Sequence, residues 1–140
     1  MNKFKTILSI VILLALFGGL IYFEMNGREN RSTLKANAPE ANLFTLYGDD
    51  HISFEEVDGI RVRTYFAEEK LELAEGVHTI KVSYKKRKFW ILFTNEITSE
   101  YVFENMEFFP GEQLTVTGSL NETEDVVYFS IENRSTAVSQ

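Results

Sequence analysis

The stretch LELAEGVHTIKVSY, residues 71–84, contains two short runs with apolar residues at alternate positions, joined by Glu75-Gly76. Successive side chains of a β-strand point to opposite faces of its sheet, and a glycine between two such runs suits a tight turn. One face of the second run carries His78, Ile80, Val82 and Tyr84; the other carries Thr79, Lys81 and Ser83. The stretch therefore predicts a β-hairpin whose inward face is the first of these two sets.

The same alternation recurs along the chain after residue 42, in runs rich in β-branched and aromatic residues. Turn residues separate the runs, and Asp58-Gly59 and Pro110-Gly111 are clear examples. We expect strands at 43–47, 52–57, 60–66, 71–73, 77–84, 89–94, 101–109, 113–118 and 126–132. No twelve-residue stretch there keeps a helical stripe, so the predicted fold is all-β, a small antiparallel β-sandwich with a barrel as the alternative.

The core can be predicted from the same alternation. In the last run Val127, Phe129 and Ile131 share one face. We expect Ile80, Val82, Phe129 and Ile131 to be core residues.

An uncharged apolar run, TILSIVILLALFGGLIYF at residues 6–23, precedes this domain. As a helix it would be about 27 Å long, close to the roughly 30 Å of a bilayer's hydrocarbon core. We expect residues 1–24 to be an uncleaved signal-anchor. The alternative is a cleaved secretory signal, but such signals have shorter apolar cores and a small-residue cleavage site, which Phe17-Gly18-Gly19 and Ala36-Asn37-Ala38 match poorly.

Lys3 and Lys5 form a short basic leader before the apolar run, which favours a cytoplasmic N-terminus. The expected location is therefore the cell inner membrane, as a single-pass protein whose domain faces the periplasm or the exterior. Basic residues also follow the run, at Arg28, Arg31 and Lys35, so a cytoplasmic domain stays open.

Apolar residues nearly vanish from residues 25–42, MNGRENRSTLKANAPEAN. This composition predicts a flexible, solvated tether. The expected organisation is thus an anchor at 1–24, a tether at 25–42, a β domain at 43–134 and a C-terminal tail at 135–140.

The composition excludes several classes of function. The chain has no cysteine, which removes disulfide scaffolds, thiolate metal sites, cysteine nucleophiles and the lipid-acceptor cysteine of a bacterial lipoprotein. From Glu40 onward 19 acidic residues outnumber 9 basic ones, so the domain carries a charge of about −10. A nucleic-acid partner is disfavoured, because phosphate contact needs clustered positive charge.

The residues of the first hairpin resemble a known pattern. Residues 71–84, together with VDGIRV at 57–62, are similar to the L-x-P-G-x-H-x-I-x-V-x-Y hairpin of PEGA-like β domains and of small bacterial exported or lipoprotein-like proteins. The likeness covers about thirty residues, and Ala74-Glu75 stands where the pattern usually has a proline before the glycine. It implies a β fold and an exported location rather than an activity.

Three groups of polar residues are candidate sites. His78 and His51 are the only imidazoles, and a turn cap or a bond to a backbone carbonyl is the favoured interpretation of His78 over a metal ligand. Five carboxylates within residues 49–58 lack the order of a calcium loop and favour a solvated acidic edge. The one basic cluster, Lys85, Lys86, Arg87 and Lys88 beside Trp90, is a possible interaction surface for an anionic lipid, a polysaccharide or an acidic protein, weighed against a solubilising strand connection.

No nucleophile-elbow or phosphate-binding motif occurs in the sequence, so we expect no enzymatic activity, no cofactor and no metal. The function expected is that of a non-enzymatic binding or structural module of the cell envelope. The alternative is an accessory subunit that joins a membrane complex through its transmembrane helix.

Overall fold

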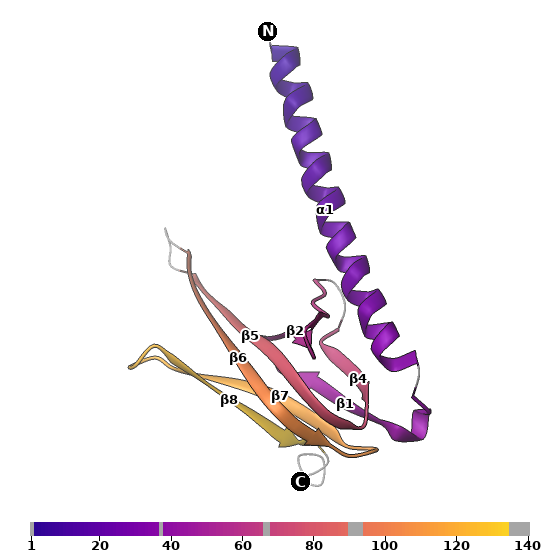
Figure 1. Cartoon of the computed structure of the whole chain (residues 1–140). Helices are drawn as coiled ribbons and strands as arrows, with labels where there is room; N and C mark the ends of the chain where they lie inside the picture. Colours follow the sequence, from indigo (N-terminus) through magenta and orange to yellow (C-terminus); the bar gives the residue numbers. More distant parts are fainter. Residues whose placement is uncertain (1, 37, 66–67, 90–93, 135–140) are drawn as a thin grey trace.

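The computed structural model describes residues 2–36, 38–65, 68–89 and 94–134, and contains one long helix followed by two β-sheets (Figure 1). The elements in chain order are α1 (Asn2–Ala36), the 3-10 turn η1 (Glu40–Asn42), β1 (Leu43–Gly48), β2 (Ile52–Val57), β3 (Ile60–Arg61), β4 (Lys70–Ala74), β5 (Gly76–Phe89), β6 (Thr94–Phe108), β7 (Gln113–Asn121) and β8 (Val126–Asn133).

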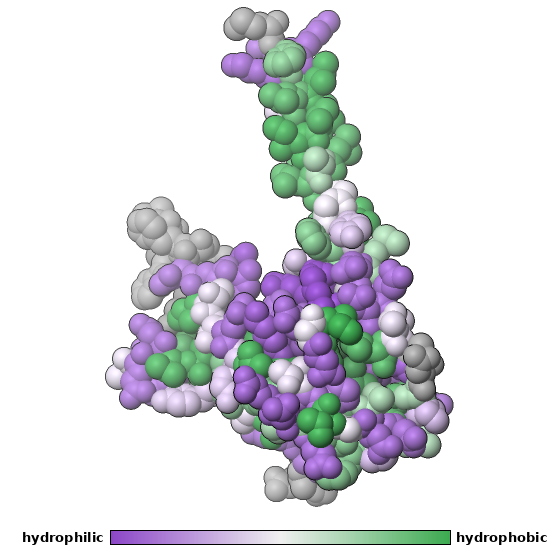
Figure 2. All heavy atoms as spheres, in the orientation of Figure 1, coloured by the Kyte–Doolittle hydropathy of each residue, from purple (hydrophilic) through white to green (hydrophobic). Residues whose placement is uncertain are grey.

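The apolar N-terminal part of helix α1, before Phe23, stands clear of the β domain. Figure 2 shows an apolar column that rises from a largely hydrophilic surface. Its length and composition suffice to cross a membrane, and none of its most apolar window is buried. The polar side chains Thr6 and Ser9 donate to helix carbonyls four residues earlier, at 2.8 Å in both cases, so they add no unpaired hydroxyl to this segment.

The structure corrects the prediction of a flexible tether over residues 25–42. Residues 25–36 continue α1 without a break, and Glu40–Asn42 form η1. The helix ends shortly before Pro39, which cannot extend it because its ring nitrogen has no hydrogen to donate. Residues 25–36 lack an apolar stripe, and polar contacts to the β domain, described below, take its place.

Each of the two sheets has four strands, in the orders β4-β1-β7-β8 and β3-β2-β5-β6. All neighbours are antiparallel except β1 and β7, which run parallel, so the predicted antiparallel arrangement holds for most pairs but not for this one. Among the described residues the sheets do not close into a barrel.

The strand boundaries differ from the sequence prediction in two places. The strand expected at 60–66 is only Ile60–Arg61 in the structure. The strands expected at 77–84 and 101–109 are longer in the structure, since β5 runs to Phe89, β6 begins at Thr94, and these two residues pair. Of the separate strand expected at 89–94, residues 90–93 lie outside the described residues. Alternation reports that a segment is extended, but not where one long strand ends and the next begins.

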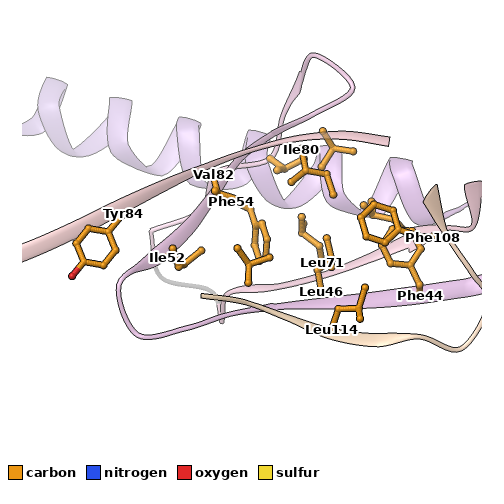
Figure 3. Close-up of a cluster of buried hydrophobic side chains, with 14 residues drawn as sticks. Phe44, Leu46, Ile52, Phe54, Leu71, Ile80, Val82, Tyr84, Phe108 and Leu114 are labelled. Atoms are coloured by element: carbon orange, nitrogen blue, oxygen red, sulfur yellow. The ribbon is translucent and has the colours of Figure 1, made fainter. Parts of the chain in front are cut away.

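The core lies between the two sheets. Figure 3 shows Leu46 and Leu114 from one sheet facing Phe54 and Val82 from the other. The prediction that Ile80 and Val82 are core residues is confirmed, since both are 0% exposed. Phe129 and Ile131 face the core but are only partly buried, because β8 is the last strand of its sheet and has a neighbour on one side only.

The hairpin predicted over residues 71–84 is wrong: β4 pairs with β1 in one sheet and β5 pairs with β2 and β6 in the other, so Glu75-Gly76 carries the chain between the two sheets. Alternation gives the face of a strand but not its partner. The hairpin predicted at Asp58-Gly59 is confirmed. At Asp58-Gly59 both residues have positive φ, 50° and 80°, as a two-residue hairpin between β2 and β3 requires.

Candidate interaction surfaces

The lower part of α1 is docked against one side of the β domain, along β3, residues 62–65 and β4; we call this side the docked edge. Arg61 donates to the carbonyl of Phe23 at 2.9 Å, and its guanidinium lies 5.0 Å from the centre of the Phe23 ring. The carboxylate of Glu24 accepts from the backbone N–H of Tyr65 and from Arg28. The β domain therefore contacts α1 from the last residue of the apolar run onward.

Arg31 is the centre of the docked edge. Its Nε donates to the carbonyl of Val62 at 2.7 Å, and its Nη1 reaches the carbonyls of Lys70 and Glu68 at 3.2 and 3.3 Å. Its Nη2 lies 3.4 Å from the carboxylate of Glu69. The side chains of Arg31 and Glu69 are only 13% and 20% exposed, and this burial lowers the pKa of Arg31 and raises the pKa of Glu69.

Two further contacts set how closely the helix approaches. A Cβ on Gly27 would lie 2.0 Å from the carbonyl oxygen of Arg63, so only glycine permits this distance. Asn30 donates to the carbonyl of Arg61 at 2.7 Å. These bonds satisfy backbone carbonyls of a segment that has left its sheet, which is why an irregular segment can be held here.

The last turn of α1 adds an ion pair. The ammonium of Lys35 lies 2.7 Å from the carboxylate of Glu72 on β4. The hydrogen bond from Lys35 lowers the pKa of Glu72, and the same bond raises the pKa of Lys35. With this pair, residues from Phe23 to Lys35 contact the domain, so helix α1 and the domain are joined along about three turns.

The predicted interaction surface at residues 85–90 lies at the far end of the β5–β6 hairpin. Lys85 and Arg87 both pair with Glu96 across the hairpin, at 3.3 and 3.1 Å, and the hydrogen bond from Arg87 is the main cause of the lowered pKa of Glu96. Lys86 lies opposite Ile97 in the strand register. The Lys88 side chain and Trp90 lie outside the described residues. One carboxylate thus serves two cations, which leaves this end of the hairpin with excess positive charge.

His78 links two turns. Its Nε2 lies 2.7 Å from the carbonyl of Ala74, and its Nδ1 lies 2.6 Å from the carboxylate of Asp58. The same carboxylate accepts the backbone N–H of Thr79 at 2.9 Å. The prediction that His78 bonds a backbone carbonyl is confirmed, and the Asp-Gly turn and the Glu-Gly turn of the sequence pattern are joined through this one ring.

The five carboxylates of residues 49–58 are dispersed. Glu55 accepts from Arg63 and from Ser83, at 2.7 and 2.6 Å, while Asp58 contacts His78. In the part of the chain that the structure describes, no three His, Asp or Glu side chains are placed to hold a metal ion.

Within the described residues, no strand or helix covers the side opposite the docked edge, and we call this side the open edge. It consists of β6 and β8, the last strands of their sheets. The rings of Tyr101 and Phe129 stack across it with centres 5.4 Å apart, while the outward side chains Val126 and Tyr128 are exposed. A free strand edge presents unpaired backbone donors and acceptors to a partner.

Sequence reasoning missed the docked edge. The sequence pattern assigns Arg31 to a solvated tether and Glu24 to the end of the anchor, because their partners in the domain lie 31 to 41 positions further along the chain. A local signal was nevertheless present, since a helix with acid at Glu24 and base at Arg28 has the spacing of an intrahelical ion pair.

Comparison of the chain with protein-family models, with curated proteins and with solved structures found no match. The resemblance of the hairpin to PEGA-like domains therefore stays a prediction.

Proposed function

We propose that this protein is a membrane-tethered, non-enzymatic β domain of the cell envelope that binds another envelope component. In this proposal α1 is an uncleaved, single-pass anchor in the inner membrane, and the domain lies on the periplasmic or outer side. The observation that carries the proposal is the continuity of α1, which runs from an exposed apolar segment directly into a segment bonded to the domain.

The docked edge favours an anchor over a cleaved signal. Cleavage after Ala36-Asn37-Ala38, the nearest small-residue pattern, would remove Arg31, whose bonds organise the segment between β3 and β4. That loss would expose backbone carbonyls that now have partners. The bonds from Arg31 to the backbone of the domain thus support retention of residues 1–36 in the mature protein.

The anchor is tested by mass spectrometry of the protein isolated from membranes, combined with carbonate extraction. We expect the intact mass of the full chain, in the carbonate-resistant fraction. A mature protein that begins after Phe23, or a full-length chain released by carbonate, would contradict the proposal. Protease treatment of spheroplasts tests the location of the domain: digestion is expected, and protection would place the domain in the cytoplasm.

The open edge supports the binding role. Strand addition to an exposed sheet edge gives affinity through backbone hydrogen bonds and specificity through alternate side chains, and β8 offers both. The docked edge does not offer them, because α1 covers it.

A second candidate function is that of an accessory subunit bound through the transmembrane helix. Gly18 and Gly19 have nothing within 4 Å of an added Cβ, so a second helix can approach α1 there. Replacement of residues 6–22 by an unrelated leucine-rich span separates the two candidates. Co-purification of a partner from mild detergent should survive this exchange if the β domain binds it, and should be lost if the helix does.

A further inference from the structure

We propose that the free end of the β5–β6 hairpin, residues 85–89 and 94–98, rests on anionic lipid headgroups of the membrane that α1 crosses. The inference rests on the proposed function, since it requires α1 to be a membrane anchor.

The docked edge fixes the direction in which the hairpin points. Bonds to α1 extend from Phe23 to Lys35, so the domain cannot rotate about the helix without breaking the contacts of Arg31. Arg61 also contacts Phe23 itself, which places this side of the domain where the apolar run ends. An orientation set at the docked edge is therefore transmitted to the rest of the two sheets.

The hairpin extends beyond its own sheet. Strand β2 pairs with β5 only as far as Tyr84, opposite Ile52, whereas β5 and β6 stay paired to Phe89 and Thr94. The backbone N–H of Lys85 still donates to the carbonyl of His51, and the part of β5 beyond it is about 13 Å long at the usual strand rise. Figure 1 shows the paired strands β5 and β6 rising from the domain on the side toward which the apolar part of α1 extends.

The charge of this end matches an anionic surface. Residues 85–98 contain four basic residues and one acidic residue, in a domain that is otherwise strongly acidic. Lys85 and Arg87 share Glu96 as their partner. The positive charge left over is therefore concentrated at the part of the domain directed toward the membrane, where acidic headgroups attract it.

The residues that join β5 to β6 lie outside the described part of the chain, and only their identity enters the argument. They are Trp90, Ile91, Leu92 and Phe93. Basic side chains followed by tryptophan and phenylalanine have the composition of segments found at the membrane interface.

The experiment uses the absence of native cysteine, which allows a single fluorescent label at chosen positions. Asn95→Cys reports on the hairpin end, and Glu107→Cys is the matched control at the exposed opposite end of the same strand. Leu13→Cys reports on the helix. Each full-length variant is reconstituted in vesicles of phosphatidylcholine and phosphatidylglycerol that contain a nitroxide either on the headgroup or deep in the acyl chain.

We expect the headgroup nitroxide to quench the label at residue 95 several-fold more than the label at residue 107, and the deep nitroxide to quench the label at residue 13. Equal quenching at 95 and 107, with residue 13 quenched, overturns the inference and leaves the anchor intact. A residue 13 label that the deep nitroxide does not reach contradicts the anchor itself.

Two further measurements test the role of charge. Omission of phosphatidylglycerol, or replacement of all four basic residues at 85–88 by Gln, should reduce quenching at residue 95 to the level of residue 107. Lys81→Gln is the control, because Lys81 lies on β5 away from the free end and pairs with Glu100. Undiminished quenching at residue 95 in vesicles of phosphatidylcholine alone would overturn the assignment to anionic lipid. This lipid comparison needs no charge variant, so it does not depend on whether such a variant folds.

Discussion

The two sides of the β domain are completed in different ways. At the docked edge α1 supplies donors for the carbonyls of Arg61, Val62 and Lys70, and a glycine at position 27 lets the helix approach the backbone. At the open edge β6 and β8 end their sheets, and in the described part of the chain no helix covers them. Both edges belong to the same pair of sheets, but helix α1 lies along one of them and not along the other.

This difference assigns a separate task to each side. A sheet edge whose polar groups are satisfied by a helix is unavailable to other chains, and here that helix continues into the exposed apolar run at residues 6–23. At the open edge, no strand among the described residues pairs with the outer side of β6 or β8. We infer that the docked edge positions the domain and that the open edge is where a partner strand is accommodated.

The largest effect is expected from a charge in the core that both sides share. Val82→Asp places a carboxylate at a position that is 0% exposed. The unfolding free energy should fall by about 4 kcal/mol or more, because an unpaired charge would be buried. Urea unfolding of the full chain in detergent micelles measures it, and a loss below about 1 kcal/mol would mean that the two sheets do not share this core.

Gly27→Ala tests the docked edge alone. An added Cβ would collide with the carbonyl of Arg63, so the helix must move away, and we expect a loss of about 1–3 kcal/mol in the same urea experiment. Gly19→Ala is the matched control, since its Cβ meets nothing within 4 Å. Equal behaviour of the two variants would show that α1 is not held against the domain.

The ion pair between Glu72 and Lys35 makes the stability of the docked edge depend on pH, and Glu72→Gln removes this dependence. The folded-state pKa of Glu72 is lowered, first by the hydrogen bond from Lys35, so its stabilisation is present above the ordinary glutamate pKa and is lost as the pH falls through the folded-state pKa. The variant should be less stable than wild type near neutral pH by up to about 0.5 kcal/mol, and the difference should vanish in acid.

Unfolding curves across the acid range measure this difference. In a double-mutant cycle, Lys35→Gln alone should remove most of the stability that Glu72→Gln removes, because both substitutions break the same ion pair. If the difference in unfolding free energy between Glu72→Gln and wild type increased as the pH fell, the prediction would be contradicted.

Tyr128→Lys tests the open edge and should have the smallest effect. The side chain is 57% exposed, so the unfolding free energy should change by less than about 0.5 kcal/mol. A lysine on a free strand edge opposes strand addition, so partner co-purification should decrease while stability does not. Full retention of the partner would direct attention to the β5–β6 hairpin instead.

Local sequence patterns predicted part of this structure. The apolar run at residues 6–23 predicts a membrane-length helix because no charge interrupts it, and Asp58-Gly59 predicts a hairpin because both positions accept positive φ. Period-two alternation identified the inward faces of β5 and β8. Each of these inferences depends only on neighbours in the chain.

Only the tertiary structure decided which strands are neighbours, that β1 and β7 run parallel, and that residues 25–36 are helical. Alternation specifies a face but not a partner, and the helix beyond Phe23 is held by polar groups more than thirty residues away rather than by an apolar stripe. The sequence alone therefore determined the anchor-length helix and the extended strands. The docked edge depends on long-range hydrogen bonds, and the one local signal, the spacing of Glu24 and Arg28, indicates a helix but not its partners in the domain.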